Sequence, residues 1–251
     1  MNNKIFVNLF RVLIILVFIF LWEYLSYKNI INSFIFSSPS KIIKCISTLY
    51  NSNNLFNHIF ITITETVVAF SLSIIIALFI GILFYECNFI YRVLEPFLTL
   101  FNSMPKVALG PLIIIIFGAK ETSIIIMALS ITLILNIMQI YNSFSQTDKY
   151  LDKLLTIYHA SRYEKLKYLV IPSALVTIVN SLKINISMTL IGVIMGEFLV
   201  SKAGIGYLIV YGSQVFNLTL VLTGIFILIL ISFIMYVIIT IIENKIKRSY
   251  D

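Results

Sequence analysis

The stretch IFITITETVVAFSLSIIIALFIGILFY, residues 59–85, contains one charged side chain, Glu65, and no proline. In hydrocarbon every backbone polar group needs a hydrogen-bond partner within the protein, and a continuous α-helix of about 20 residues spans the apolar core of a bilayer. We therefore predict that this stretch is a membrane-spanning helix.

The rest of the chain has the same apolar character. Of its 251 residues 60% are hydrophobic and 12% are charged, and the mean hydropathy is +1.02, whereas soluble domains carry about 25% charged residues. Further apolar blocks lie at residues 12–27, 93–117, 122–141, 171–195 and 218–242. These blocks predict an all-α fold: a polytopic membrane helical bundle of about six transmembrane helices, forming one domain over residues 1–251, with the lipid bilayer as its solvent.

Basic residues predict how the bundle is oriented. With a cytoplasmic N-terminus, 11 Lys and Arg fall inside and 5 outside, a bias that places both termini in the cytoplasm. The inside group is Lys4, Arg11, Arg92, Lys149, Lys153, Arg162, Lys165, Lys167, Lys245, Lys247 and Arg248, and the outside group is Lys28, Lys41, Lys44, Lys120 and Lys202. The net charge of +7 is thus read as an orientation signal, and no nucleic-acid partner is expected. The first block lacks a small-residue cleavage site and is read as an uncleaved anchor.

Two short segments depart from a simple bundle of straight membrane-spanning helices. Ser38 and Pro39 predict the start of an amphipathic helix on the outer face, which the polar residues Asn51, Ser52, Asn53 and Asn54 end. In the third block Pro105, Gly110 and Pro111 interrupt the helix. Freed backbone groups at membrane depth need cover from protein or water. The break is therefore expected near the permeation path.

Polar groups inside the spans each have two interpretations. Lys183 lies about 16 Å into the fifth block, where it either attracts an anion in transit or bonds to a neighbouring carbonyl or carboxylate, and the same alternatives apply to Lys106. Glu65 and Glu197 are expected at an interface or in a pair. Asn185 marks a face toward the bundle interior or makes an interhelical hydrogen bond, and Gly192 with Gly196 predicts close helix packing. The candidates for the translocation path are Lys183, Lys106, Pro105, Asn185 and Glu197.

The sequence contains no recognisable enzymatic equipment. HExxH, GxSxG and GKS/T motifs are absent, and Cys45 and Cys87 match no metal or redox spacing. A membrane enzyme is therefore disfavoured, and no metal or cofactor is expected. If transport is powered by ATP, another chain binds the nucleotide.

The connection 142–170 is the long polar loop on the inner side. Leu151, Leu154, Leu155 and Tyr158 share one helical face, and Tyr163, Leu166, Leu169 and Val170 share another. Apolar stripes outside the membrane either bind a partner or pack against their own bundle, and periodicity leaves both possibilities open.

This loop resembles the "EAA" signature of binding-protein-dependent ABC importer permeases. Asp148, Leu151, Ala160, Ser161, Arg162 and the Ile171-Pro172 pair occupy matching positions. The sequence departs from the pattern where Lys153 replaces Glu, Leu154 and Leu155 replace two Ala, and His159 replaces the turn Gly; Asp152 offers an acidic group one residue earlier. His tolerates positive φ better than a β-branched residue does.

Four more stretches are similar to the nitrate, sulfonate and taurine branch of that family. They are Ser37 to Ser40, Met104 to Leu112, and the pair Gly192 to Glu197 and Gly204 to Ile209.

The resemblance implies a transporter made of several proteins with different roles. ABC ATPase subunits would bind ATP, an extracytoplasmic solute-binding protein would deliver substrate, and a second permease copy would complete the path, so this chain would carry no ATPase site. The expected coupling loop comprises Asp148, Leu151, Asp152, Lys153, Leu154, Leu155, Tyr158, His159, Ala160, Ser161 and Arg162. The expected cargo is a small anion such as a sulfonate, taurine or nitrate.

Two alternatives remain open at this point. Within the same class, the cargo is a thiamine-related pyrimidine or another vitamin precursor. In another class, the chain is an ion-coupled secondary transporter, but the inverted repeats and buried charge relay typical of that class are not found, and the amphipathic inner loop is left unexplained.

Overall fold

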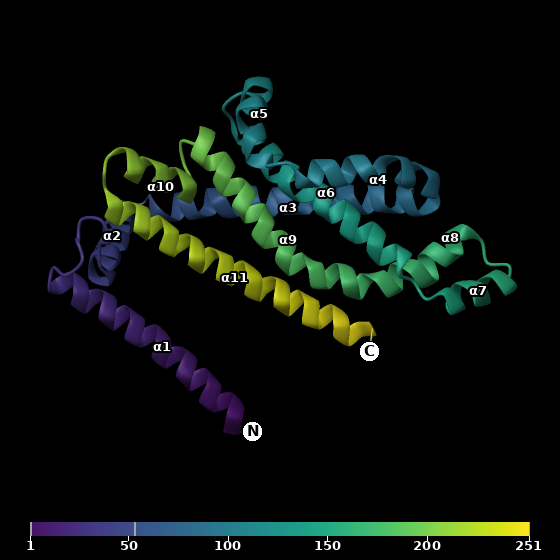
Figure 1. Cartoon of the computed structure of the whole chain (residues 1–251), viewed down its shortest axis with the longest axis horizontal. Helices are drawn as coiled ribbons and strands as arrows, with labels where there is room; N and C mark the ends of the chain where they lie inside the picture. Colours follow the sequence, from purple (N-terminus) through teal and green to yellow (C-terminus); the bar gives the residue numbers. More distant parts are fainter. Residues whose placement is uncertain (1, 53, 251) are drawn as a thin grey trace. The chain divides into compact units, whose positions relative to one another are not determined.

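The computed structural model describes residues 2–52 and 54–250, with side chains for residues 6–7, 9–52 and 54–247. Throughout this part of the chain the regular structure is helical, which confirms the predicted all-α fold (Figure 1). The helices before the inner loop are α1 (Asn2–Tyr27), α2 (Pro39–Asn51), α3 (Leu55–Glu86), α4 (Asn88–Ser103), the 3₁₀ turn η1 (Lys106–Leu109), α5 (Gly110–Phe117) and α6 (Glu121–Ser145). After them come α7 (Lys149–Ile157), α8 (Arg162–Lys165), the π turn η2 (Leu166–Val170), α9 (Ile171–Val200), α10 (Ile205–Gln214) and α11 (Leu218–Tyr250).

Five helices in the described residues are long and apolar enough to cross a bilayer, and a sixth crossing results if α4 and α5 form one broken span. The five are Leu9–Tyr27, Leu55–Glu86, Glu121–Ser145, Arg162–Val200 and Leu218–Lys247. Their positions match the apolar blocks of the sequence, although most of the helices extend several residues beyond them. Hydropathy marks the part of a helix in hydrocarbon, whereas the helix itself continues until a capping or breaking residue ends it.

The third block is not one straight helix. Asn88–Ser103 and Lys106–Phe117 meet at an angle of 89°. Met104 has an extended backbone, with φ −66° and ψ 145°, because a residue before proline avoids the α-helical region. The break that Pro105 predicts is thus present, and α4 begins at Asn88, earlier than the predicted 93.

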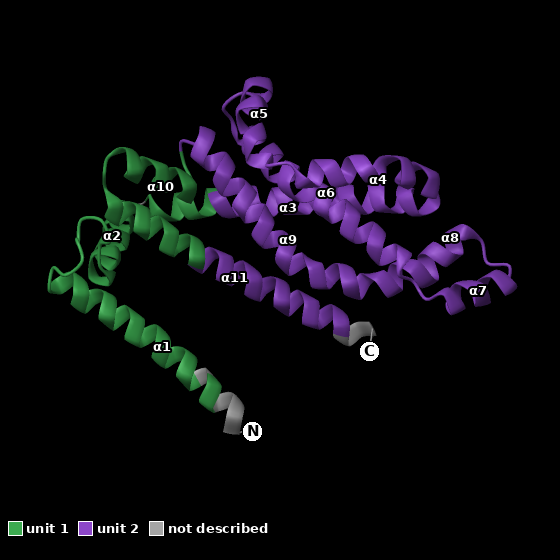
Figure 2. Cartoon of the chain, viewed as in Figure 1, with its two compact units in different colours: residues 1–61, 203–229 green, residues 62–202, 230–251 purple. Residues whose placement is uncertain are grey.

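The described chain divides into two compact units, residues 1–61 with 203–229 and residues 62–202 with 230–251 (Figure 2). In the first unit the Ser38 hydroxyl accepts a hydrogen bond from the Lys41 N–H, and the carboxylate of Glu23 accepts two from Ser40. The predicted N-cap and start of α2 are therefore confirmed, while Asn53, one of the residues expected to end this helix, lies outside the described residues. The prediction of a single domain stays a prediction.

The second unit has its core between α3, α6 and α9. Its buried side chains include Ala77 and Phe84 of α3, Ile140 and Phe144 of α6, and Ala174 of α9. A polar contact crosses the same region, because the Asn136 amide donates to the Ser73 hydroxyl at 2.7 Å.

Glycines bring α6 and α9 into close contact. A Cβ on Gly192 would lie 2.6 Å from Cα of Ala128, and one on Gly196 would lie 2.9 Å from Cα of Ile124. The predicted packing role of these two glycines is confirmed.

Candidate functional site

The inner loop is a pair of short helices with defined ends. The Asp148 carboxylate accepts a hydrogen bond from the Tyr150 N–H at 2.7 Å and so caps α7. Ser161 caps α8 in a capping box with Glu164. Between them His159 has φ 57°, which is the left-handed conformation that usually selects glycine. The departure from the signature at His159 therefore preserves the turn.

Polar contacts hold this helix pair together. The Lys165 ammonium lies 2.9 Å from the Asp152 carboxylate and donates to the Thr156 hydroxyl at 2.7 Å, which joins α8 to α7. The Arg162 guanidinium donates to the Glu86 carbonyl at 3.3 Å and joins α8 to the end of α3. Sequence reasoning did not single out Lys165, because its partner lies 13 residues away across a turn.

The two apolar stripes of the loop have different environments. Leu166, Leu169 and Val170 are buried, and Leu166 and Val170 belong to the core of the second unit. The second stripe thus packs against its own bundle, apart from the exposed Tyr163.

On α7, by contrast, the apolar side chains are not covered. Leu151 and Leu154 are 46% and 48% exposed, and Tyr158 is 75% exposed. Leu155 is partly buried, Lys153 is exposed on the other side of the helix, and Ala160 is partly buried in the turn. The apolar face of α7, defined by Leu151, Leu154, Leu155 and Tyr158, is therefore available to another protein.

Three of the five path candidates lie in contacts between helices. Lys183 of α9 forms an ion pair with Glu243 of α11, which is the structural alternative left open by the sequence. The Asn185 amide donates to Gln139 of α6 at 3.0 Å, and the buried Glu197 accepts from the Thr62 hydroxyl at 2.6 Å. These groups hold helices together.

The other two candidates lie at the break after α4. Pro105 is exposed. The Lys106 ammonium donates to the carbonyl and the side-chain oxygen of Asn102 at 3.2 and 3.0 Å. This places a positive charge at the carboxyl end of α4, where the helix dipole is negative.

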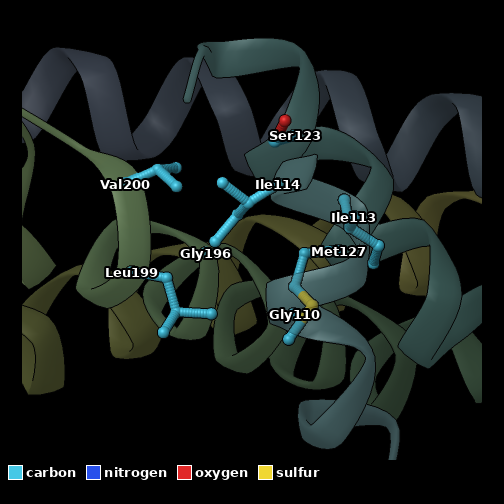
Figure 3. A pocket seen from close by; sticks show the side chains of 8 residues that line it. All are labelled: Gly110, Ile113, Ile114, Ser123, Met127, Gly196, Leu199 and Val200. Atoms are coloured by element: carbon cyan, nitrogen blue, oxygen red, sulfur yellow. The ribbon is translucent and has the colours of Figure 1, made fainter. Parts of the chain in front are cut away.

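The far side of the break is closely packed. A cavity of only about 10 Å³ lies between α5, α6 and α9 (Figure 3). Figure 3 shows Ile113, Met127 and Leu199 around it, from three different helices. A cavity of this size holds about one water molecule, so this part of the break is a packing contact without room for a solute.

A buried carboxyl pair lies in the α3 to α9 contact. Glu65 and Glu197 are 5% and 1% exposed, and their carboxyl groups face each other within interaction range. Among the described residues no hydroxyl, amide or basic group hydrogen-bonds to Glu65. The sequence predicted a paired or interfacial role for both residues, and the structure pairs them with each other.

Comparison with known proteins identifies the family to which this chain belongs. Residues 69–248 match the model of the binding-protein-dependent transport system inner membrane component. The chain belongs to this family. The matched range includes the inner loop and all helices of the second unit except the beginning of α3 and the end of α11.

Individual relatives and a solved structure agree with this assignment. A putative aliphatic sulfonates transport permease of Bacillus subtilis is 24% identical over 94% of this chain and 86% of its own length. A formylaminopyrimidine transport permease of Halalkalibacterium halodurans is 25% identical over 78% of this chain and 77% of its own length. The inward-facing methionine ABC transporter MetNI contains a chain with a TM-score of 0.67 and 20% identity, covering 78% of this chain and 96% of that one, and it shows the fold.

These results confirm the resemblance to sulfonate-transporting permeases that the sequence suggested. The chain is a multi-pass inner-membrane permease of the ABC importer type. The family works with ABC ATPases and solute-binding proteins, so the ion-coupled alternative loses its support.

Proposed function

We propose that this permease moves a small anion, most simply a sulfonate, into the cytoplasm by alternating access, driven by ATPase subunits that bind the apolar face of α7. The observation that carries the proposal is the combination of an uncovered apolar face and a rigid support. Leu154 and Tyr158 are exposed, while Lys165 joins α8 to α7 and Arg162 joins α8 to the end of α3.

The rigid support of α7 is needed because a movement of the ATPase must be transmitted through this helix to the membrane-spanning helices. Movement of a docked ATPase shifts α7 as a body, and the contacts of α8 and η2 with the core pass this shift to α3 and α9. Hinge and shear motions of packed helices of this kind change access across transport proteins. A flexible loop would absorb the displacement.

A second copy of the chain completes the path in this proposal, with both termini in the cytoplasm. The exposed apolar residues of α4 and α5 are consistent with contact to another helix bundle or to lipid. Examples are Phe97, Phe101, Leu112 and Ile115.

A pyrimidine is the second candidate cargo. It is favoured by the similarity to the formylaminopyrimidine permease, whose identity to this chain equals that of the sulfonate relative within one percentage point. Uptake of radiolabelled ethanesulfonate and of an aminopyrimidine by cells that express the complete transporter separates the two cargoes.

Co-purification tests the coupling proposal. The chain is expressed with its candidate ATPase subunits and isolated in detergent, as wild type and as Leu154→Glu and Tyr158→Glu. Because an introduced carboxylate must be desolvated in an apolar contact, we expect each variant to retain less than about a tenth of the ATPase. Lys149→Glu, which places the same carboxylate outside the apolar face, is the matched control. Equal retention by all three variants would overturn the proposal.

A further inference from the structure

We infer that α2 is an interfacial helix that binds phospholipid. It lies along the bilayer surface at the membrane face where α1 ends, with one apolar flank among the acyl chains and its polar side among the headgroups. The inference needs only that the chain spans the membrane, so it does not depend on the cargo or on the ATPase.

The start of α2 is tied to the ends of two membrane spans. The Ser26 hydroxyl, in the last turn of α1, donates to the Ser37 carbonyl at 3.0 Å. The Ser37 hydroxyl donates to the hydroxyl of Thr219, in the first turn of α11, at 3.1 Å. Both α1 and α11 are long and apolar enough to cross a bilayer, and both ends belong to the same compact unit as α2 (Figure 2). The amino end of α2 is therefore at the membrane surface.

The other end of α2 is tied to a third span. Only residues 52–54 separate α2 from α3, and the Tyr50 ring contacts the Phe56 ring with 5.7 Å between their centroids. Phe56 and Phe60 are exposed, so the lipid-facing surface of α3 begins at its first turns.

The length of α2 then fixes its direction. Its 13 residues make a helix about 20 Å long, too short to cross about 30 Å of hydrocarbon. The end of α1 and the start of α3 consequently lie on one membrane face. Because both ends of α2 lie beside span ends on that face, the helix runs along the surface and not away from it.

Polar and apolar side chains are segregated around α2. The exposed polar residues occupy an arc of about 120°, and they are Ser40, Lys41, Lys44, Ser47 and Thr48. On the opposite side Ile42 is buried and Ile46 and Leu49 are partly buried. The protein thus covers the middle of the apolar side.

One edge of the apolar side is not covered by the described chain. Ile43 and Tyr50 are 68% and 55% exposed, and their spacing of seven residues places them on one flank of the helix. We call these two residues the apolar flank of α2. It continues into the exposed Phe56 of α3, so it joins a surface that already faces lipid.

The loop before α2 has the same character. Phe34, Ile35 and Phe36 are exposed, and the indole N–H of Trp22 in α1 donates to the Phe36 carbonyl at 3.2 Å. Aromatic side chains of this kind are enriched at the membrane-water interface, where an apolar ring and a polar group meet different surroundings.

Charge favours a phospholipid as the occupant. α2 contains Lys41 and Lys44 and no acidic residue, and both lysines are on the polar side. Lysine stems reach past apolar surface and place their ammonium groups at the level of the lipid phosphates. Lysines opposite an aliphatic and aromatic flank are typical of helices that lie in the plane of the interface.

Quenching of tryptophan fluorescence by brominated phosphatidylcholine tests the depth of α2 without any partner protein. The chain has one tryptophan, Trp22, so Trp22→Phe provides a blank background. Single tryptophans then replace Ile43 or Tyr50 on the apolar flank. Thr48→Trp, about 140° around the helix from Ile43, is the matched control, and Phe18→Trp in the middle of α1 is the reference for the bilayer centre. Each chain is reconstituted in vesicles with bromines at acyl carbons 6 and 7 or at carbons 11 and 12.

We expect the shallow bromines to quench Ile43→Trp and Tyr50→Trp by at least about half, and the deep bromines to quench them about twofold less, since interfacial helices insert about 5 to 10 Å. Thr48→Trp should lose less than about a quarter of its fluorescence with either lipid. Phe18→Trp should show the reverse order of the two lipids, because it lies near the middle of its span. In the wild type, Trp22 should follow the shallow pattern and so report the level of the loop without any substitution.

Three results would overturn the inference. Flank positions that only aqueous iodide quenches would show a surface open to water, which a soluble protein could cover. Stronger quenching of the flank by the deep bromines would place α2 within the hydrocarbon, and equal quenching of Ile43→Trp and Thr48→Trp would remove the orientation. If Ile43→Trp fails to insert, Tyr50→Trp, which keeps an aromatic ring, and wild-type Trp22 decide between these outcomes.

Discussion

Lys183 of α9 forms an ion pair with Glu243 of α11, and the Glu243 carboxylate also lies 2.7 Å from the Lys247 ammonium. The Lys183 ammonium is 5.5 Å from the centroid of the Tyr236 ring. Two interactions, with the Glu243 carboxylate and with the Tyr236 ring, thus hold Lys183 at the contact of two helices.

We predict that Glu243→Ala lowers the thermal unfolding midpoint in detergent, because Lys183 loses its counter-charge while it remains at the helix contact. Each single charge reversal, Lys183→Glu or Glu243→Lys, should lower the midpoint as well, and the double variant should recover at least about half of the summed loss, since the attraction between the two positions is restored. Thermal unfolding of the two single reversals and of the double variant provides the comparison. Additive effects of the single variants would show that the pair does not stabilise the contact.

Substitutions at His159 test the turn between α7 and α8. Its φ of 57° costs a residue with a Cβ about 1 kcal/mol relative to glycine. We predict that His159→Gly stabilises the loop by about this amount, and that His159→Val destabilises it by a similar amount because β-branched residues tolerate positive φ poorly. Hydrogen exchange of the amides of α7 and α8 measures both effects. Slower exchange in the valine variant than in the glycine variant would contradict the prediction.

Hydropathy predicted where the helices cross the membrane, since burial in lipid requires continuous apolar sequence. The block 59–85 appears as Leu55–Glu86, and Pro105 marks the break. Helix caps were also readable, because a cap depends on neighbouring residues such as Ser38 and Pro39.

Partners of buried charges were not predictable in the same way. Glu243 lies 60 residues after Lys183, and only the packing of α9 on α11 brings the two together. Glu95, Thr99 and Asn102 share one face of α4, and this polar spacing was readable from the sequence. It was missed because residues 93–117 were treated as one apolar block, which concealed the amphipathic period of its first part.

Close packing of α6 and α9 leads to a prediction for Gly192. An added Cβ would lie 2.6 Å from Cα of Ala128, and backbone atoms cannot move aside as a flexible side chain can. We expect Gly192→Ala to destabilise the protein by about 1 to 3 kcal/mol. Ile191→Ala, at an exposed position next to it, should change stability by less than about 0.5 kcal/mol. Unfolding in detergent titrated with SDS measures both, and equal effects would refute the close-packing argument.

The buried pair Glu65 and Glu197 allows two substitutions with effects of opposite sign. Glu65 faces a second carboxyl group and receives no hydrogen bond from a hydroxyl, amide or basic group among the described residues. Glu197 is thus the polar neighbour of Glu65, and the Glu65 carboxyl oxygens are otherwise unsatisfied; an under-satisfied buried polar group costs about 1 to 3 kcal/mol. We therefore predict that Glu65→Leu raises stability by about 1 kcal/mol or more, since it removes this cost and keeps a side chain of similar size.

Glu197→Leu should have the opposite effect, because the buried Thr62 hydroxyl loses the acceptor that lies 2.6 Å away. We expect a loss of about 1 to 3 kcal/mol, measured by the same SDS titration as for Glu65→Leu. If Glu65→Leu were as destabilising as Glu197→Leu, Glu65 would have to make a stabilising bond in the folded bundle. The contrast between the two glutamates therefore separates a carboxyl group that holds α3 to α9 from one that the bundle tolerates at a cost.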